Sequence, residues 1–265
     1  MTITVAVINQ KGGVGKTTTA VNLSACLGNL GHRTLLIDAD PQSNTSISYG
    51  FLPKDLDTSF YSFLISGDKF ENVVKKTIVE NLDILPTTAD LYAADLDLVQ
   101  LDGHNYDILK SRLEEVKKIQ EKKPNKYEFI IIDSPPHLGP LTLNLMKASD
   151  TIIVPLKADF LALQGLAILY KTFNKIKNKW NNKLTILGIL LTMYSSTLNI
   201  CKDVETNVKN SFQSLVFENK IPQNVTIAES PSYSVPVTIH GPKSVGALSY
   251  MNFTMEFLRK IHKVK

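Results

Sequence analysis

The chain has 265 residues, of which 43% are hydrophobic and 20% are charged, so its composition is that of an ordinary globular protein with one large domain or two small ones. No apolar run reaches the length of about 18 residues that a membrane-spanning helix needs. The net charge of +4 is unevenly distributed: residues 1–150 carry 15 Lys and Arg against 19 Asp and Glu, and residues 151–265 carry 14 against 6. A basic carboxyl-terminal part is typical of a protein that meets DNA or an acidic membrane, although solvated lysines give the same composition.

Short aliphatic or β-branched runs alternate with helical patterns along the chain. The predicted strands are Ile3–Ile8, Thr34–Asp38, Leu82–Leu85, Phe129–Asp133, Thr151–Pro155 and Leu184–Thr192. The predicted helices are Thr17–Leu30, Asn105–Lys122, Leu161–Lys179 and Asn199–Phe212. This alternation favours an α/β fold, a mostly parallel twisted sheet with helices on both faces, and we expect a single domain over residues 1–265.

The first predicted strand begins almost at Met1 and leads directly into a glycine-rich loop. Because this start has neither a basic stretch nor a small-residue cleavage site, we expect a cytoplasmic protein without a signal peptide or a separate amino-terminal DNA-binding domain. Cys26 and Cys201 are too few for a zinc site or a disulfide framework, so we expect both to be buried.

The loop NQKGGVGKTT, residues 9–18, lies between the first predicted strand and helix, which is the context of a phosphate-binding P-loop. Its glycines let successive backbone N–H groups turn toward phosphate oxygens, and the start of the helix adds its positive end. We expect Lys16 to reach the β- and γ-phosphates of ATP, Thr17 to ligate Mg²⁺, and Thr18 to lie near the α-phosphate. The loop residues predicted to bind ATP by their backbone are Gly12, Gly13, Val14 and Gly15.

Lys11 is a second lysine in this loop. It could not share a phosphate with Lys16 without mutual repulsion and costly desolvation. The pattern K-G-G-x-G-K-[ST] resembles the deviant Walker A motif of the ParA/MinD family, whose members form ATP sandwich dimers. The resemblance implies that Lys11 reaches the partner's nucleotide and neutralises charge that develops on phosphate, as an arginine finger does in other NTPases.

A second motif, LLIDADPQ, ends a predicted strand in two carboxylates. Carboxylates at the carboxyl ends of parallel strands lie where ligands bind in such sheets. The motif resembles the D-x-D-P-Q switch segment of the same family. This resemblance implies that Asp40 positions or polarises the attacking water and that Asp38 lies nearer the Mg²⁺ shell.

A third motif, FIIIDSPPHLG, has the four apolar residues and the carboxylate, Asp133, that a Walker B strand needs beside Mg²⁺. Its tail, D-x-P-P-x-L-G, resembles the ParA/Soj-like branch more than the membrane-associated MinD branch. His137 occupies the variable position, and we assign it no role because the sequence shows no partner for it.

The resemblance to the ParA branch covers nearly the whole chain. Residues 191–193 and 221–232 resemble the segments that close over the adenine base, which implies contacts from Met193, Pro222 and Asn224. The arginines that serve nonspecific DNA binding in the typical small chromosomal pattern are absent, and the matching positions are Thr197, Gln223 and Thr226.

Lysines are the remaining candidates for DNA binding, since they contact phosphates as point charges without reading sequence. The candidates are Lys171, Lys175 and Lys179, at helical spacing, and Lys243. A solvated helix face is the alternative interpretation of the first three.

The carboxyl-terminal segment Met251–Lys265 has apolar and basic residues at helical spacing. Such a helix can lie on anionic lipid, as in MinD relatives, or it can cover the sheet as the last core helix. We favour the core helix, and therefore do not expect membrane binding, because the Walker B tail resembles the ParA branch.

Taken with the resemblance, these motifs predict an ATP-hydrolysing DNA-partition protein. ATP and Mg²⁺ are expected to drive a sandwich homodimer that binds nonspecific DNA on the nucleoid, and a ParB-like centromere-binding protein is expected to stimulate slow hydrolysis. The cargo would be a plasmid or a chromosome region. A MinD-like peripheral membrane ATPase is the alternative. A metabolic P-loop kinase or amide ligase would not need Lys11, and nitrogenase-reductase-like chemistry would need cluster-binding cysteines that are not visible.

Overall fold

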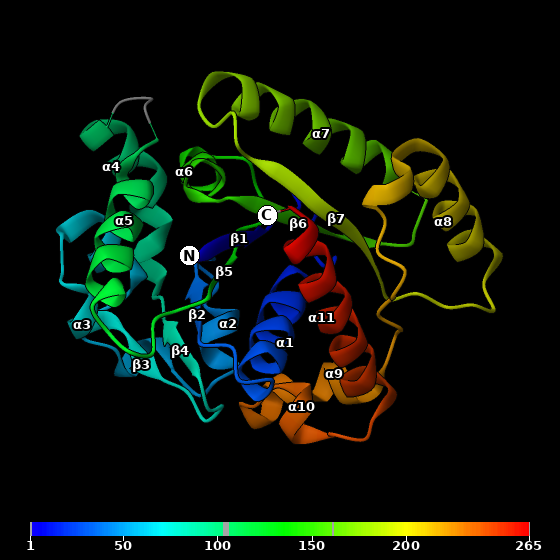
Figure 1. The fold of residues 1–265 in the computed structure, drawn as a ribbon, viewed down its shortest axis with the longest axis horizontal. Helices are drawn as coiled ribbons and strands as arrows, with labels where there is room; N and C mark the ends of the chain where they lie inside the picture. The colour runs from blue at the N-terminus through cyan, green and yellow to red at the C-terminus, as the bar shows by residue number, and fades with distance from the viewer. Residues whose placement is uncertain (1, 103–105, 161, 265) are drawn as a thin grey trace.

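The computed structural model describes residues 2–102, 106–160 and 162–264 (Figure 1). Within them, seven strands form one sheet in the order β3-β4-β2-β5-β1-β6-β7. Neighbouring strands are parallel except for the edge pair β3 and β4. The strands are β1 (Ile3–Val7), β2 (Thr34–Asp38), β3 (Lys75–Lys76), β4 (Leu82–Leu85), β5 (Phe129–Asp133), β6 (Thr151–Lys157) and β7 (Thr185–Thr192). The prediction of a mostly parallel α/β sheet is confirmed. The edge strand β3 was not predicted, because two residues are too short to form a pattern.

Helices cover both faces of the sheet (Figure 1). They are α1 (Lys16–Asn29), α2 (Asn44–Ile47), α3 (Phe70–Val73), α4 (Ala94–Asp102), α5 (Ile108–Glu121), α6 (Pro140–Ala148), α7 (Ala162–Lys179), α8 (Asn199–Phe212), α9 (Val225–Glu229), α10 (Val237–His240) and α11 (Val245–Val264). A 3₁₀ turn, η3 (Ala89–Ala93), leads directly into α4. The four predicted helices correspond to α1, α5, α7 and α8, while the predicted limits at Asn105, Leu161 and Lys265 lie outside the described residues.

The apolar side chains of the inner strands alternate between two apolar layers. On β1, Val5 and Val7 pack in the layer of α1 and α11, and Ala6 packs in the opposite layer with α5, α6 and α7. Helix α11 buries one face, formed by Tyr250, Phe253, Phe257 and Ile261. The prediction that the last helix belongs to the core is therefore confirmed. Among the described helices, we find none with the length and apolar character needed to cross a membrane.

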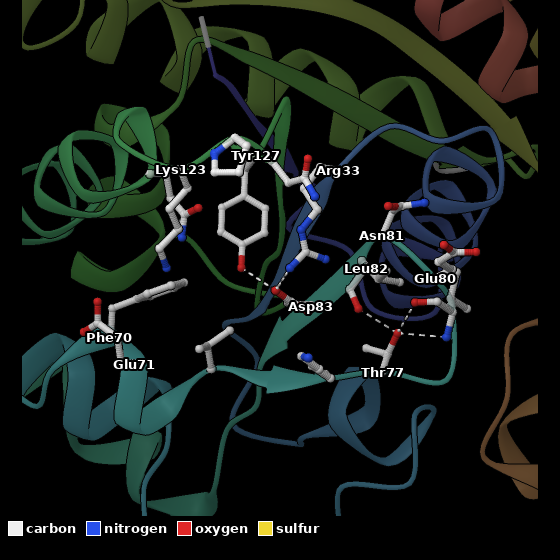
Figure 2. A pocket seen from close by; sticks show the side chains of 16 residues that line it. Arg33, Phe70, Glu71, Thr77, Glu80, Asn81, Leu82, Asp83, Lys123 and Tyr127 are labelled. Atoms are coloured by element: carbon white, nitrogen blue, oxygen red, sulfur yellow. Dashed lines mark hydrogen bonds and ion pairs between the residues drawn. The ribbon is translucent and has the colours of Figure 1, made fainter.

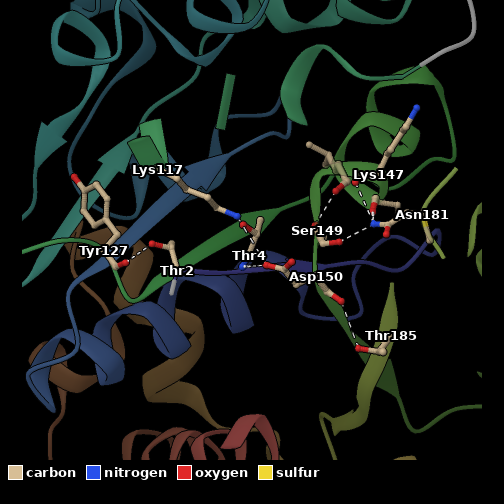
Figure 3. A network of polar contacts seen from close by, with 11 residues as sticks. Thr2, Thr4, Lys117, Tyr127, Lys147, Ser149, Asp150, Asn181 and Thr185 are labelled. Carbon is tan, nitrogen blue, oxygen red and sulfur yellow. Dashed lines mark hydrogen bonds and ion pairs between the residues drawn. The ribbon is translucent and has the colours of Figure 1, made fainter. Parts of the chain in front are cut away.

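The amino-terminal edge of the sheet is closed by polar contacts between elements that are distant in sequence (Figure 3). The Asp150 carboxylate accepts the Thr4 N–H at 2.8 Å, and the Asp150 carbonyl accepts the Thr185 N–H at 3.2 Å. The Asn181 side chain donates to three backbone carbonyls at the carboxyl-terminal end of α6, where carbonyls have few partners within the helix. These contacts connect β1, β6 and β7 at this edge. The loops that carry the sequence motifs lie at the opposite, carboxyl-terminal edge.

Candidate nucleotide-binding site

The loop between β1 and α1 has the backbone shape of a phosphate cradle. Gly13 and Gly15 adopt φ values of +67° and +85°, a left-handed conformation that is favourable mainly for glycine. Between them, Val14 is buried and its carbonyl accepts the Thr192 hydroxyl at 2.8 Å, which attaches the loop to the end of β7. The first amides of α1 have no partners within the helix, so the loop and the helix start together form an anion-binding end.

A cavity of about 330 Å³ opens over this loop, and we call it the phosphate cavity. Its lining consists of Gly12, Gly13, Gly15, Lys16, Thr17, Thr18, Asp40, Gln42, Asn44, Pro136 and Met193. The structure thus brings together predicted residues of the P-loop, Asp40 of the switch motif and Met193 of the segment 191–193. Gln42 and Pro136 lie in the second and third motifs but were not singled out, because a motif does not show which of its side chains turn toward the ligand.

Lys16 is almost fully buried beneath the cavity. Its ammonium donates to the Lys11 carbonyl at 3.3 Å. Burial lowers the pKa of Lys16, and the nearby carboxylates of Asp133 and Asp40 oppose this shift. A cation with little surrounding water interacts strongly with an anion that enters the cavity.

Asp133 is fully buried at the end of β5. Its Oδ2 accepts the hydroxyls of Thr17 and Thr45, each at 2.7 Å. Burial raises the pKa of Asp133 to about 6, against the lowering effect of the two hydroxyls. Its Oδ1 has no hydrogen-bond partner among the described residues. A buried acceptor without a partner, next to the Thr17 hydroxyl, fits a hydrated Mg²⁺ whose water could donate to it. Thr45 was not predicted, and only its position shortly after the switch motif could have indicated it.

Asp38 lies opposite Asp133 in the register of β2 and β5. Its Oδ2 accepts the backbone N–H and the hydroxyl of Ser46, at 2.7 and 2.6 Å, and its Oδ1 accepts the Asp40 N–H at 3.2 Å. Burial and, second, the negative charge of Asp133 raise the pKa of Asp38 to about 8. These bonds fix the turn that presents Asp40 to the phosphate cavity. A place for Asp38 in the Mg²⁺ shell stays a prediction.

The Lys11 side chain is bound within its own chain. Its ammonium lies 2.8 and 2.6 Å from the two carboxylate oxygens of Asp159, in the connection between β6 and α7. The two side chains are 33% and 30% exposed. Lys11 is therefore turned toward Asp159 instead of lining the phosphate cavity with Lys16. Its contact with a partner's nucleotide stays a prediction.

A second cavity, of about 350 Å³, adjoins the first, and we call it the base cavity. It brings together the predicted Met193, Pro222 and Asn224, with Ile227 and Tyr250 completing the lining among others. Met193 lines both cavities and has a φ of +49°, which is strained for a residue with a side chain and is a feature found at ligand sites. The Asn224 side chain accepts the Ile227 N–H at 3.2 Å and so caps α9 at the cavity wall.

The four candidate DNA-binding lysines are all exposed, but the structure places them in two groups. Helix α7 runs from the end of β6 back to the start of β7, so Lys171, Lys175 and Lys179 approach the edge of the sheet opposite the P-loop. Lys243 lies between α10 and α11, and Figure 1 shows these helices far from α7. The structure therefore does not bring Lys243 together with the three lysines of α7.

A wider cavity, of about 710 Å³, lies at the amino-terminal ends of β2 and β4 and is bordered by β3 (Figure 2). Asp83 lies within it, where it pairs with Arg33 and accepts the Tyr127 hydroxyl at 2.5 Å. The buried Asp83 carboxylate is thus already satisfied by Arg33 and Tyr127, and among the described residues the cavity adjoins no glycine loop and helix start of the P-loop kind. We therefore assign the nucleotide to the phosphate and base cavities.

Comparison with known proteins gives matches over most or all of the chain. The family model for the AAA domain matches residues 2–186. The sporulation initiation inhibitor protein Soj of Bacillus subtilis is 40% identical over 252 residues, which cover 95% of this chain and 96% of Soj. The chromosome partitioning protein ParA of Myxococcus xanthus is 37% identical over 256 residues, which cover 97% of this chain and 88% of ParA. A solved structure of cobyrinic acid a,c-diamide synthase from Mycobacterium smegmatis, with bound ATP analogue and magnesium, matches with a TM-score of 0.86 and 32% identity, over 100% of this chain and 97% of that one.

Proposed function

Because the chain belongs to the ParA/Soj family of chromosome-partitioning ATPases, we propose that it hydrolyses ATP, with Mg²⁺, to partition a plasmid or a chromosome region. The observation that carries this proposal is the buried Asp133 beside the P-loop. One of its oxygens is held by Thr17 and Thr45, and the other has no hydrogen-bond partner in the part of the chain that the structure describes. Thr17 and the buried Oδ1 of Asp133 would hold hydrated Mg²⁺, which supplies charge neutralisation on phosphate when bound. Lys16 and the loop amides would bind the phosphates, and Asp40 would orient the attacking water.

We propose further that the ATP-bound chain forms a face-to-face homodimer in which Lys11 leaves Asp159 for the partner's nucleotide. The partly exposed Lys11–Asp159 pair supports this, since such pairs are weak and exchange partners at low cost. Phe160, directly after Asp159, is 85% exposed, and a large apolar side chain beside the site is what an interface would cover.

We propose that nonspecific DNA is bound through the lysines of α7, which would associate the protein with the nucleoid. This helix has no acidic residue, and Lys171, Lys175 and Lys179 are exposed along it. A ParB-like protein would stimulate hydrolysis and so reset the dimer. The MinD-like alternative is less well supported, because the aromatic face of α11 is buried in the core and unavailable to lipid, which leaves Val245, Leu248 and Met255 as its exposed large apolar side chains.

Amide synthesis is a second candidate, favoured by the name of the similar Mycobacterium smegmatis structure. An amide ligase would use ATP to activate a carboxylate and would not need a lysine that reaches across a dimer. Full turnover in a Lys11→Ala variant, together with dependence on an amine donor, would support this candidate over partition.

The test is binding of a labelled nonspecific duplex to the protein with ADP, with ATP, and with ATP in an Asp40→Ala variant that cannot hydrolyse it. Salt is varied throughout, and anionic liposomes are measured in parallel. We expect ATP-dependent, salt-sensitive DNA binding without liposome binding. Liposome binding alone would favour the MinD-like alternative, and binding of neither would contradict the proposed DNA contact.

Variants then locate the DNA surface. Replacing Lys171, Lys175 and Lys179 with Gln should lower the slope of log affinity against log salt by about 3, since each phosphate contact contributes about 0.9. The matched control replaces the exposed lysines Lys118, Lys122 and Lys123 with Gln, which changes the net charge equally but leaves α7 intact. Equal losses in both variants would show that net charge, and not α7, determines binding.

A further inference from the structure

One short segment, η3 and the start of α4, contacts two of the loops that line the phosphate cavity. The Tyr92 hydroxyl accepts a hydrogen bond from the side-chain amide of Gln42, in the loop after β2. Asp95, one helical turn later, contacts the loop between β5 and α6, where Pro136 lies. Gln42 and Pro136 both line the cavity. The segment thus contacts both the loop that follows β2 and the loop that follows β5, the two strands that carry the predicted carboxylates.

Both oxygens of the Asp95 carboxylate contact the β5–α6 connection. Its Oδ1 accepts the Leu141 N–H at 2.7 Å, in the first turn of α6, where a negative charge is favourable. Its Oδ2 lies 2.9 Å from Nε2 of His137. A side chain at Gly139 would collide with this carboxylate, so the loop can approach it closely only with glycine there. This gives His137 the partner that the sequence did not show.

The rest of the connection is equally constrained. The His137 carbonyl accepts the Thr142 hydroxyl at 2.6 Å, and two consecutive prolines precede His137. Asp133 lies only three residues before Pro136, and Asp40 lies two residues before Gln42. Each loop thus begins within a few residues of a carboxylate that the proposed function uses, so a shift of the loop would occur next to that carboxylate.

We propose that Asp95 and Tyr92 are positioning residues for ATP hydrolysis, which hold the two loops at a fixed separation around the phosphate cavity. The inference rests on the proposed ATPase activity. Neither residue lines the cavity, so neither contributes to the cradle that binds phosphate. Displacement of a reacting group by about 1 Å can reduce a rate by about 100-fold, so loss of this support should affect the chemical step more than nucleotide binding.

The test compares Asp95→Ala with Asp95→Asn, whose side-chain oxygen can still accept the Leu141 amide. We expect Asp95→Ala to lower kcat about tenfold or more, to leave the Kd for ADP within about twofold, and Asp95→Asn to restore most of the loss. Asp97→Ala is the matched control, because it removes a carboxylate from the same helix and its bond to the Tyr61 hydroxyl, but touches neither loop. It should keep the kcat of the wild type.

Hydrogen exchange supplies a second readout that does not depend on turnover. In Asp95→Ala, amide exchange should quicken in residues 134–142 and also in residues 40–46, since the segment joins the two loops. An unchanged kcat in Asp95→Ala, or an equal loss in Asp97→Ala, would overturn the inference, as would faster exchange in residues 134–142 alone. A wild-type protein that binds ATP without hydrolysing it would refute the proposed function. The hydrogen-exchange pattern would then show by itself whether the segment with Tyr92 and Asp95 couples the two loops.

Discussion

Replacing Asp159 with Asn should activate the protein, if Lys11 must leave Asp159 to act in a dimer. The Lys11 ammonium contacts both carboxylate oxygens, at 2.8 and 2.6 Å, and about a third of each side chain is exposed. Solvent screening limits such a pair to about 1 kcal/mol. A dimer breaks two of these pairs, one in each chain, so the variant should gain about 2 kcal/mol, or about 30-fold, in the dimerisation constant.

The measurement is the dimer dissociation constant with ATP in a background that blocks hydrolysis, and the basal ATPase rate against protein concentration in the active background. We expect the concentration for half-maximal activity to fall in Asp159→Asn, while the Kd of the monomer for ADP is unchanged. Asp203→Asn, at an exposed position on α8, is the matched control for the loss of one negative charge. The gain should also disappear when Lys11→Ala is added.

Two results would refute this reasoning. An Asp159→Asn protein that dimerises no more tightly than the wild type would show that the pair does not compete with assembly. A gain that persists in the double variant with Lys11→Ala would show that Asp159 acts through another contact. Either result would remove the structural support for the movement of Lys11.

Four further predictions concern the site, the core and one helix. The pKa of Asp38 is raised to about 8 from an ordinary 3.8, so between these pH values the folded protein binds more protons than the unfolded chain. The free energy of unfolding, measured in urea, should therefore fall as pH rises from about 4 to about 8, and its pH profile should be flatter in Asp38→Asn. Thr17→Ala should reduce the Mg²⁺-dependent gain in ATP affinity about tenfold or more, as measured by calorimetry with and without Mg²⁺. An equal loss of ATP affinity in the absence of Mg²⁺ would contradict the assignment of Thr17 as a metal ligand. Gly188→Ala should cost about 1–3 kcal/mol in urea unfolding, because its Cβ would lie 2.5 Å from the Phe217 ring. Gly165→Ala, with open space on α7, should instead stabilise the protein by about 0.5–1 kcal/mol.

The strands and long helices were predictable from the sequence because each has a strong local signal. Apolar runs mark the buried parallel strands, and helices such as Asn199–Phe212 have apolar residues at three- and four-residue spacing. Helices α4 and α6 have nine residues each and were not predicted. Helix α6 begins with Pro140 after Gly139, which is a recognisable start signal, but α4 depends mainly on contacts with α6 and η3.

The residues of the candidate site were predictable where one motif supplies both the chemistry and the position. Lys16 and Asp133 are of this kind, since a glycine loop and a buried strand fix them locally. Thr45 and Asp95 could not be found this way, because their partners lie 88 and 46 residues away in the chain, respectively. A polar residue in such a contact has no local pattern that distinguishes it from a solvated one.

The bonds around the phosphate cavity divide the site into fixed and movable parts. The P-loop is held by Thr192, the turn before Asp40 by Ser46, and Asp133 by two threonine hydroxyls, all within one chain and mostly out of contact with water. Buried hydrogen bonds of this kind are costly to break, so these parts are already in place before nucleotide arrives. Lys11 differs, because its partner is a carboxylate that is about a third exposed, and in the proposed dimer the phosphate of the second chain's nucleotide would replace it. In the proposed dimer, such a site would bind nucleotide in the monomer and take its last cation from the second chain, which would link hydrolysis to dimerisation.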